Sequence, residues 1–538
     1  LAEVPAVSAM APVKSPALPH VLARLLQPNA SKAARDPPTG STIADQAGRL
    51  IIQGRCGDAF TILDNAIKKA RPTINTRFLS GLYCMRGVAA AGTGDLERAL
   101  SDICSAISIN PDNCEALNSR AMHYLDMGDL TAALADIDRA IALVPSAPRF
   151  YSTRSAIYLQ LGDIARARLD CDMVIELDPQ FPEAYANRAV CNCMDDPPSL
   201  SLALKDVTFG IDMDPSNAAL YKVRAGILFL LDRKDDSLAD MDVAVSLRPA
   251  DMKLRALRGD MHARNGELGA AIADFTAVIE ARPDMLDAVI ARGQLHADKE
   301  DWKEALADYD SVLSVEPDNV DALVGLAWVK FCTSAMMESA QTAMKCIQLA
   351  SADKDKSALY VAHFIIGMVA TYQQRNEDAV AAFTSALSFD SSSLSARANR
   401  ANCLLDLERY TEANQDASVC VRKEPCCEYF LLRSRARLGL RQLKNGLKDA
   451  EQALRLDPNC IQAHLVSARF HVALGDLDHA LADCDAGLAI EPGNDGLRNF
   501  RASISDTLEH EHQEPSTKRR RVGKKAEVRD IENKGVVN

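Results

Sequence analysis

A proline returns at a nearly constant interval along most of this 538-residue chain. Its positions are Pro111, Pro145, Pro179, Pro215, Pro249, Pro283, Pro317, Pro425, Pro458 and Pro492. Most of these prolines follow two short segments whose apolar residues are spaced for one helical face, and about thirteen such pairs recur. A fixed period of about 34 residues is typical of a solenoid, in which stacked helix pairs bury a continuous core. The repeat therefore predicts an all-α chain with long surfaces for other proteins and no closed pocket.

Residues 114–145 illustrate one copy of the repeat. The first helical face ends at Gly128, because glycine readily adopts the left-handed conformation found at helix ends. A second face follows and ends at Pro145, whose ring cannot continue a helix. Ala121 in the first helix and Ala133 in the second are small, and a large side chain at either position would push the two helices apart.

These small residues recur in register. In the first helices they are Gly87, Ala121, Ser155, Ala189, Ala225, Gly259, Gly293, Ala401 and Ser434, and in the second helices Ala99, Ala133, Ala167, Ala203, Ala271, Ala305, Ala379, Ala413 and Ala480. Over about residues 42–492 the pattern resembles the tetratricopeptide repeat family. The resemblance implies an antiparallel helix pair in each of about 13 repeats and a right-handed superhelical solenoid, whose concave face is lined by the first helices.

An arginine precedes the small residue of the first helix, and an aspartate follows it at a constant spacing in the second helix. The pairs are Arg86/Asp102, Arg120/Asp136, Arg154/Asp170, Arg224/Asp240, Arg258/Asp274, Arg292/Asp308, Arg400/Asp416 and Arg433/Asp449, with the slightly wider pair Arg188/Asp206. The constant spacing predicts partly buried ion pairs that join the two helices of each repeat. The alternative is a row of arginines that binds acidic ligands, but each arginine has its own carboxylate.

The regularity of the repeats divides the chain into five parts. Residues 1–41, which are rich in proline, and residues 509–538 are predicted to be disordered. Between them we expect an N-terminal array of repeats over 42–317, divergent repeats over 318–391, and a C-terminal array with a capping helix over 392–508.

The divergent repeats of 318–391 depart from the pattern in composition and in length. Leu326 and Thr342 occupy one arginine–aspartate position, and Ile366 and Ala382 occupy the next. The span to the following repeat is a few residues longer than two periods. We expect this stretch to act as a joint between the two arrays; the alternative is that apolar residues simply pack in place of the ion pair.

Composition narrows the classes of function. The net charge of −13 argues against nucleic-acid binding by the solenoid, which would need a basic surface. The sequence has no apolar run long enough to cross a membrane. Its 15 cysteines are odd in number and follow no secretory signal, which favours reduced thiols and a location in the cytoplasm, the nucleus or both.

The sequence predicts neither catalysis nor a metal site. It contains no phosphate-binding Gly-rich loop, no His-Glu-x-x-His and no Gly-x-Ser-x-Gly. The cysteine pairs Cys191/Cys193 and Cys426/Cys427 have no second close pair at ligand spacing. His464, His471 and His479 fall on different helical faces or helices. We therefore expect a non-enzymatic protein without cofactor or metal.

The tail carries a basic run made of Lys518, Arg519, Arg520, Arg521, Lys524 and Lys525. Such a run resembles a nuclear-import signal and would make an import receptor a partner. The alternatives are a solvated basic tail or one that folds back on the acidic solenoid.

The sequence of some repeats resembles the tetratricopeptide modules of chaperone cofactors, as at Asn187-Arg188-Ala189 and Asn399-Arg400-Ala401. The resemblance implies heat-shock chaperones as partners. In that family a lysine–asparagine–asparagine–lysine–arginine set over three repeats clamps a C-terminal carboxylate, but no such set assembles around Asn187 or Asn399.

The register of the resemblance also indicates which side chains face the groove. They are Asn118, Met122, Leu125, Lys222 and Phe229 in the first array and Asn402, Arg435 and Arg469 in the second. A mixed groove suits an extended or helical segment of a partner, and the two arginines suit an acidic peptide or a carboxylate. The alternatives are core packing for Phe229 and solvated or paired arginines.

The leading hypothesis is a scaffold that binds protein or peptide segments. Its alternatives are a chaperone cofactor that recognises an acidic or C-terminal peptide, and a targeting or regulatory subunit of an enzyme complex.

Overall fold

The computed structural model describes residues 43–69 and 75–513, and every regular element in those ranges is an α-helix. The helices are α2 (Ile43–Ile52), α3 (Cys56–Lys68), α4 (Thr76–Thr93), α5 (Leu96–Ile109), α6 (Cys114–Met127), α7 (Leu130–Leu143), α8 (Pro148–Leu161), α9 (Ile164–Leu177), α10 (Pro182–Cys193), α11 (Leu200–Met213), α12 (Ala218–Leu230), α13 (Lys234–Leu247), α14 (Met252–Arg264), α15 (Leu268–Ala281), α16 (Leu286–Asp298), α17 (Trp302–Val315), α18 (Val320–Cys332), α19 (Met336–Leu349), α20 (Lys356–Tyr372), α21 (Asn376–Phe389), α22 (Leu394–Asp406), α23 (Tyr410–Lys423), α24 (Cys427–Gly439), α25 (Leu443–Leu456), α26 (Ile461–Leu474), α27 (Leu477–Ile490) and α28 (Asp495–Gln513). In the described ranges each even-numbered helix from α2 to α26 is paired with the helix that follows it, which gives thirteen pairs and confirms the predicted architecture.

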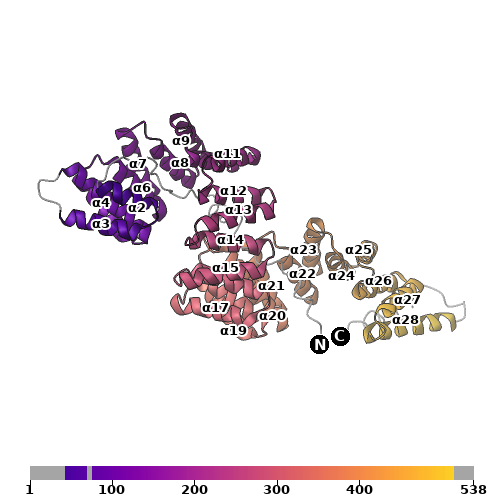
Figure 1. The fold of residues 1–538 in the computed structure, drawn as a ribbon. Helices are drawn as coiled ribbons and strands as arrows, with labels where there is room; N and C mark the ends of the chain where they lie inside the picture. The colour runs from indigo at the N-terminus through magenta and orange to yellow at the C-terminus, as the bar shows by residue number, and fades with distance from the viewer. Residues whose placement is uncertain (1–42, 70–74, 514–538) are drawn as a thin grey trace. The chain divides into compact units, whose positions relative to one another are not determined.

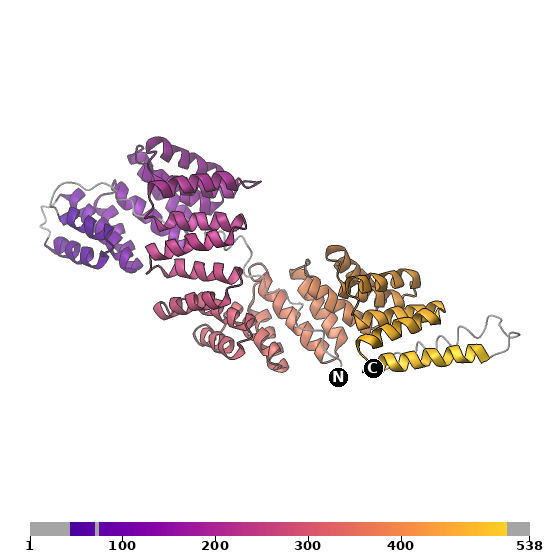
Figure 2. The same cartoon turned by 45° about the vertical axis from the view of Figure 1, so that its right-hand side comes forward.

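The described chain forms two compact units, residues 43–288 and 289–513, whose boundary lies inside α16. Within each unit the pairs stack in chain order (Figures 1 and 2). First helices of successive repeats also lie beside one another, as α6 does with α8 in one unit and α24 with α26 in the other. Each unit is therefore a solenoid with a face formed by its first helices. The role of 318–391 as a joint stays a prediction.

The turn between the two helices of a repeat has a left-handed residue in most repeats, whichever residue occupies it. Gly128 ends α6 at a φ of 81°, and Asp129 then caps α7 by accepting a hydrogen bond from the Ala132 N–H at 3.0 Å. In other repeats a residue with a side chain takes positive φ values of 56–65°, namely Asp232, Glu300, Ser334, Gln374, Glu408 and Arg441. Residues other than glycine rarely adopt this conformation, so the packing of the helix pair holds it there.

The small residues pack as the sequence predicts. Ala121 and Ala133 are fully buried. A Cβ atom on Gly87 would lie 2.8 Å from Cγ1 of Ile103 and 2.9 Å from the carbonyl oxygen of Ala99. Because such a contact is too short, this position of α4 admits only the smallest residue without separating α4 from α5.

In the divergent repeats α18–α21, apolar side chains occupy the place of the ion pair. Leu326 is buried, and Ile366 packs partly buried against the core of α18–α20. The extra residues form a turn in which the Asp355 carboxylate accepts a hydrogen bond from the Ser351 N–H, and they lengthen α20 to 17 residues. This arrangement agrees with the second interpretation of these repeats, apolar packing in place of the ion pair.

The last helix, α28, covers the end of the C-terminal unit as predicted, since Leu497, Phe500 and Ile504 are buried against α26 and α27. The helix continues to Gln513, so residues 509–513 are helical rather than part of a disordered tail. The predictions for residues 1–41, for the remainder of the tail and for the basic run Lys518–Lys525 lie outside the described residues. None of the helices in the described ranges combines the length and the apolar character needed to span a membrane.

Candidate functional site

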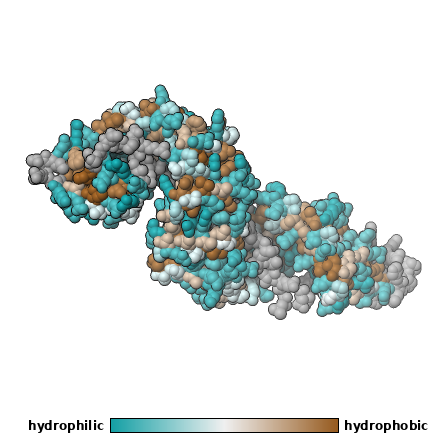
Figure 3. All heavy atoms as spheres, in the orientation of Figure 1, coloured by the Kyte–Doolittle hydropathy of each residue, from teal (hydrophilic) through white to brown (hydrophobic). Residues whose placement is uncertain are grey.

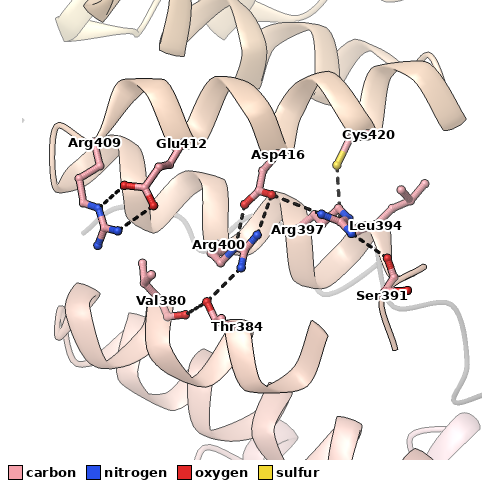
Figure 4. A network of polar contacts seen from close by, with 10 residues as sticks. All are labelled: Val380, Thr384, Ser391, Leu394, Arg397, Arg400, Arg409, Glu412, Asp416 and Cys420. Carbon is pink, nitrogen blue, oxygen red and sulfur yellow. Dashed lines mark hydrogen bonds and ion pairs between the residues drawn. The ribbon is translucent and has the colours of Figure 1, made fainter. Parts of the chain in front are cut away.

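The arginine–aspartate ladder is present in all nine predicted repeats. In each pair the arginine Nε and Nη2 donate to the two carboxylate oxygens at 2.5–3.0 Å. Figure 4 shows one such pair, Arg400 of α22 with Asp416 of α23. All the aspartates except Asp206 are buried. The structural interpretation of the ladder is therefore confirmed, because both oxygens of each carboxylate are used inside the protein.

Several of these arginines also form hydrogen bonds with the preceding repeat, a link that was not predicted from the sequence. Their Nη1 atoms donate to Asp64, Asp138, Asp172 and Asp242 from Arg86, Arg154, Arg188 and Arg258 respectively, at 2.7–3.2 Å. Arg400 donates in the same way to Thr384 Oγ1 at 3.0 Å. Apart from Asp64, each acceptor precedes its arginine by the same interval along the chain, a sequence signal that could have revealed the link. The ladder thus ties neighbouring repeats as well as the two helices of one repeat.

The groove residues predicted for the N-terminal unit are largely enclosed. Asn118, Leu125 and Lys222 are 5%, 7% and 3% exposed, whereas Met122 and Phe229 are partly buried. The Asn118 Nδ2 lies 3.6 Å from the Met122 sulfur, and its buried Oδ1 has no hydrogen-bond partner. These side chains offer a partner little surface, and their role in binding stays a prediction.

Burial lowers the pKa of Lys222. Loss of hydration lowers the pKa of its ammonium group to about 8, an effect that the nearby Asp251 carboxylate opposes and that Arg248 and Lys253 reinforce. Phe229 packs against the core of α12–α14, and the Arg264 guanidinium lies 5.9 Å from the centre of its ring. Phe229 therefore contributes both to the core and to the surface beside it.

In the C-terminal unit the structure brings Asn402, Arg435 and Arg469 together on the adjacent first helices α22, α24 and α26. We call this surface the arginine face. Arg435 Nη1 donates to Asn402 Oδ1 at 3.2 Å. The Arg435 side chain stays accessible to solvent although protein surrounds it, and the resulting loss of hydration lowers its pKa, which Asp406 partly offsets. Loss of hydration lowers the pKa of Arg469 as well, and the positive charge of Arg435 adds to the effect.

Three histidines that the sequence analysis assigned to separate faces or helices lie close together on α26 and α27. The rings of His471 and His479 stack with centroids 5.4 Å apart. His479 Nδ1 is 2.9 Å from the Asp476 carboxylate, a contact that raises the pKa of His479. His471 Nε2 and His464 Nδ1 lie 3.8 and 4.0 Å from the two oxygens of Asp483. His479 lies on a different helix from the other two, as predicted, but His464 and His471 share one face of α26, and the start of α27 meets that face.

A second cluster lies where α24, α25 and α26 meet. The sulfurs of Cys427 and Cys460 and a carboxylate oxygen of Asp457 all lie within 4.8 Å of one another. Cys426/Cys427 were not expected to be metal ligands, because no second close pair follows along the chain. The fold supplies Cys460 from the next repeat, a separation that local spacing could not indicate.

Comparison with known proteins identifies the repeats. A family profile described as Tetratricopeptide repeat matches residues 118–182, 233–286, 290–331, 366–417 and 431–495, and a second profile of that description matches 80–113. The chain is 32% identical to U-box domain-containing protein 70 of Oryza sativa subsp. japonica over 111 residues, which are 20% of this chain and 14% of that protein. It is 29% identical to sperm-associated antigen 1 of Mus musculus over 103 residues, 19% of this chain and 11% of that protein. Both similarities therefore cover a small part of the relatives.

Among solved structures, the APC/C hetero-tetramer Cut9–Hcn1 aligns with 86% of this chain and 96% of the matched chain. The sequence identity is 13% and the TM-score is 0.45.

Proposed function

Because this chain belongs to the tetratricopeptide repeat family, we propose that it is a protein-interaction scaffold that holds an acidic segment of a partner on the arginine face. The observation that carries the proposal is the pair Arg435 and Arg469, two partly dehydrated cations that stand one repeat apart on adjacent helices. In a chain with a net charge of −13, this is a local concentration of positive charge.

The electrostatics of the pair favour an anionic ligand. The positive charge of Arg435 acts on Arg469 across the two helices and lowers its pKa. A carboxylate placed between them would be attracted to both and could form charge-assisted hydrogen bonds, for which the planar guanidinium is well suited. Asn402, which already accepts a hydrogen bond from Arg435, adds an amide group for the peptide backbone.

A surface of mixed character suits an extended peptide better than a folded domain of opposite charge. In Figure 3 hydrophobic and hydrophilic residues are intermixed on the visible face of the molecule, with no single large apolar area there. An extended segment gains affinity from such a surface through a few charged anchors and small apolar contacts.

The test uses the full-length chain and a short fluorescent peptide rich in aspartate and glutamate, with a free C-terminal carboxylate. Fluorescence anisotropy should show binding to the wild type. The double substitution Arg435→Gln/Arg469→Gln should weaken it by about 100-fold or more, because two charge-assisted hydrogen bonds are lost, each contributes about 1.5–3 kcal/mol, and about 1.4 kcal/mol is a factor of ten.

A matched control removes two arginines elsewhere in the same unit, one exposed and one partly exposed. Arg375 and Arg409 bind Asp378 and Glu412 at the turns before α21 and α23. Arg375→Gln/Arg409→Gln should leave peptide binding unchanged. Equal weakening by both double variants would mean diffuse charge attraction and would refute the arginine face as a site. A C-terminally amidated copy of the peptide then separates two recognition modes, since only recognition of a terminal carboxylate, as in a chaperone cofactor, is lost on amidation.

A further inference from the structure

We propose that Cys427, Asp457 and Cys460 form a binding site for a thiophilic divalent cation of the Zn²⁺ class. Two sulfurs and one carboxylate oxygen gathered within 4.8 Å need contract only slightly to surround such an ion. Zn–S bonds measure about 2.3 Å and Zn–O bonds about 2.0–2.2 Å in a tetrahedral site.

Two of the three ligands, Asp457 and Cys460, come from a loop that the fold orders by itself. Asp457 follows the last residue of α25, and its Oδ1 accepts a hydrogen bond from the Asn459 N–H at 3.0 Å. The Cys460 N–H donates to the Asp457 carbonyl oxygen at 3.2 Å. This turn brings Asp457 and Cys460 over the first residue of α24, which is Cys427. The geometry is therefore prepared before any ion binds, as a selective site requires.

The two cysteines and the carboxylate lie side by side at the start of this repeat. Both cysteines are partly buried against the apolar core of α24–α26, and the Asp457 carboxylate accepts a backbone N–H at its turn, as Asp178, Asp214 and Asp390 do in other repeats. Cys460 also occupies the position that caps the helix, where Asn113, Asn319 and Ser393 accept a backbone N–H in other repeats. Cys460 makes no such bond, so the chain gives up a helix cap at this turn.

A divalent ion binds cysteine as the thiolate, so binding at Cys427 and Cys460 would release their thiol protons to solvent. The N-termini of α24 and α26 point toward the same place and favour the negative charge of the thiolates. A water molecule would complete four-coordination.

The chemistry of the three ligands determines which class of ion they bind best. Two thiolates and one carboxylate select Zn²⁺ over Ca²⁺ or Mg²⁺, which need sets made almost wholly of oxygen. Co²⁺ accepts the same tetrahedral geometry and gives thiolate charge-transfer absorption, so it serves as the probe.

The test titrates Co²⁺ into the full-length, thiol-reduced chain and records near-ultraviolet and visible absorption. We expect a thiolate–cobalt band that saturates at one equivalent and disappears when Zn²⁺ displaces Co²⁺. Cys460→Ser should weaken Co²⁺ binding by more than about 100-fold, since even outer-shell groups change metal affinity by about 10- to 100-fold. Serine is also a good helix cap, so this variant should fold, as circular dichroism would verify.

Two further variants sharpen the result. Asp457→Asn keeps an oxygen for the Asn459 N–H but removes the charge, and should weaken binding. Cys114→Ser is the matched control, because Cys114 begins α6 as Cys427 begins α24, while Val144 and Ala147 stand where Asp457 and Cys460 would be. An unchanged band in Cys460→Ser, a loss of the band in Cys114→Ser, or no band in the reduced wild-type chain would each overturn the proposal.

The site has one consequence that rests on the proposed function. Cys427 and Cys460 lie at the starts of α24 and α26, the two helices that carry Arg435 and Arg469. A bound ion would fix the separation of these helices and so should strengthen binding of the acidic peptide. Cobalt absorption measures the metal site without any peptide, so failure of the metal site and failure of the arginine face are distinguishable.

Discussion

The regular repeats and the divergent repeats α18–α21 solve the same packing problem with different chemistry. In the α22–α23 repeat the partly buried pair Arg400–Asp416 joins the two helices (Figure 4), whereas in α18–α19 the buried Leu326 stands in place of the arginine. Both repeats keep the antiparallel helix pair. The difference shows that small residues and apolar contacts set the form of a repeat, and that the ion pair adds links to the preceding repeat.

The pKa values of two cations on α12 show how burial and charge attraction compete inside a repeat. Hydrogen bonds from Arg224 to Asp240 raise the pKa of Arg224, because the charged form is stabilised more than burial disfavours it. Lys222, two residues earlier on α12, has its pKa lowered to about 8, because burial outweighs the attraction of nearby charges. Hydrogen bonds to a carboxylate therefore outweigh burial at Arg224, whereas burial outweighs charge attraction at Lys222.

The largest expected effect comes from removing the carboxylate that serves two arginines. Asp449 accepts hydrogen bonds from Arg433 and from Arg437 at 2.6–2.8 Å. Asp449→Asn leaves both guanidinium groups without a counter-charge and should lower the local unfolding free energy of α24–α25 by about 3–5 kcal/mol. Amide hydrogen exchange of these helices measures it.

The control for this substitution is Asp378→Asn, which breaks the exposed pair with Arg375. Its effect should stay below about 0.5–1 kcal/mol. Comparable effects from the two variants would contradict the view that burial makes the ladder sensitive.

A substitution at Leu326 introduces the arginine of the ladder into a divergent repeat. Leu326→Arg alone buries a charge without a partner and should destabilise α18–α19 by about 3 kcal/mol. Adding Thr342→Asp supplies the missing carboxylate at the ladder position and should recover at least about half of the loss, as a double-mutant cycle would show. Two additive losses would mean that these repeats differ from the others in geometry as well as in chemistry.

Lys222 tests the cost of a buried cation through pH. Its pKa is lower in the folded chain than in the unfolded chain, where it is near 10.5, so the unfolded chain binds more protons between about pH 8 and 10.5. Stability should therefore rise with pH across that window. Lys222→Met should stabilise the chain at pH 7 by about 2–3 kcal/mol, with the gain disappearing as pH approaches 10.5.

Urea denaturation followed by circular dichroism at pH 7 and pH 10 measures this difference. A gain of equal size at both pH values would show that apolar packing of the methionine, and not removal of the charge, causes it.

The smallest effect concerns the link between repeats. Thr384→Ala removes the oxygen that accepts a hydrogen bond from Arg400 Nη1, while the Arg400–Asp416 pair remains. The substitution should lower the local unfolding free energy by about 0.5–1.5 kcal/mol, which would appear as faster amide hydrogen exchange at the boundary of α21 and α22. Ser385→Ala serves as the control, because the Ser385 hydroxyl donates within its own helix to the Ala381 carbonyl oxygen. It should leave exchange at that boundary unchanged.

Particular residues show why the fold could be predicted from the sequence. The constant spacing between arginine and aspartate spans one helix, one turn and part of the next helix, so the contact depends only on the form of a single repeat. The small residues were as informative as the ion pairs, because only a small side chain at Gly87, Ala121 or Ala133 lets the two helices of a repeat pack closely. The replacement of the ion pair at Leu326 was also visible in the sequence, although its outcome was left open between a joint and apolar packing.

The candidate site was predicted only in part. The register placed Asn402, Arg435 and Arg469 together, and the structure confirms that they are neighbours. The same register gave Lys222 and Leu125 as groove residues, but these are buried, because the register gives the face of a helix and not how closely the next repeats enclose it.

The sequence by itself determined the period, the helix pairs and the contacts within each repeat, since all of these depend on short separations along the chain. The tertiary structure decided three features. They are the left-handed turn at residues such as Arg441, the exposure of Arg435 against the burial of Lys222, and the meeting of Cys427 with Asp457 and Cys460. Each depends on how helices and repeats lie against one another, and that arrangement follows from the sum of many small contacts that no local spacing records.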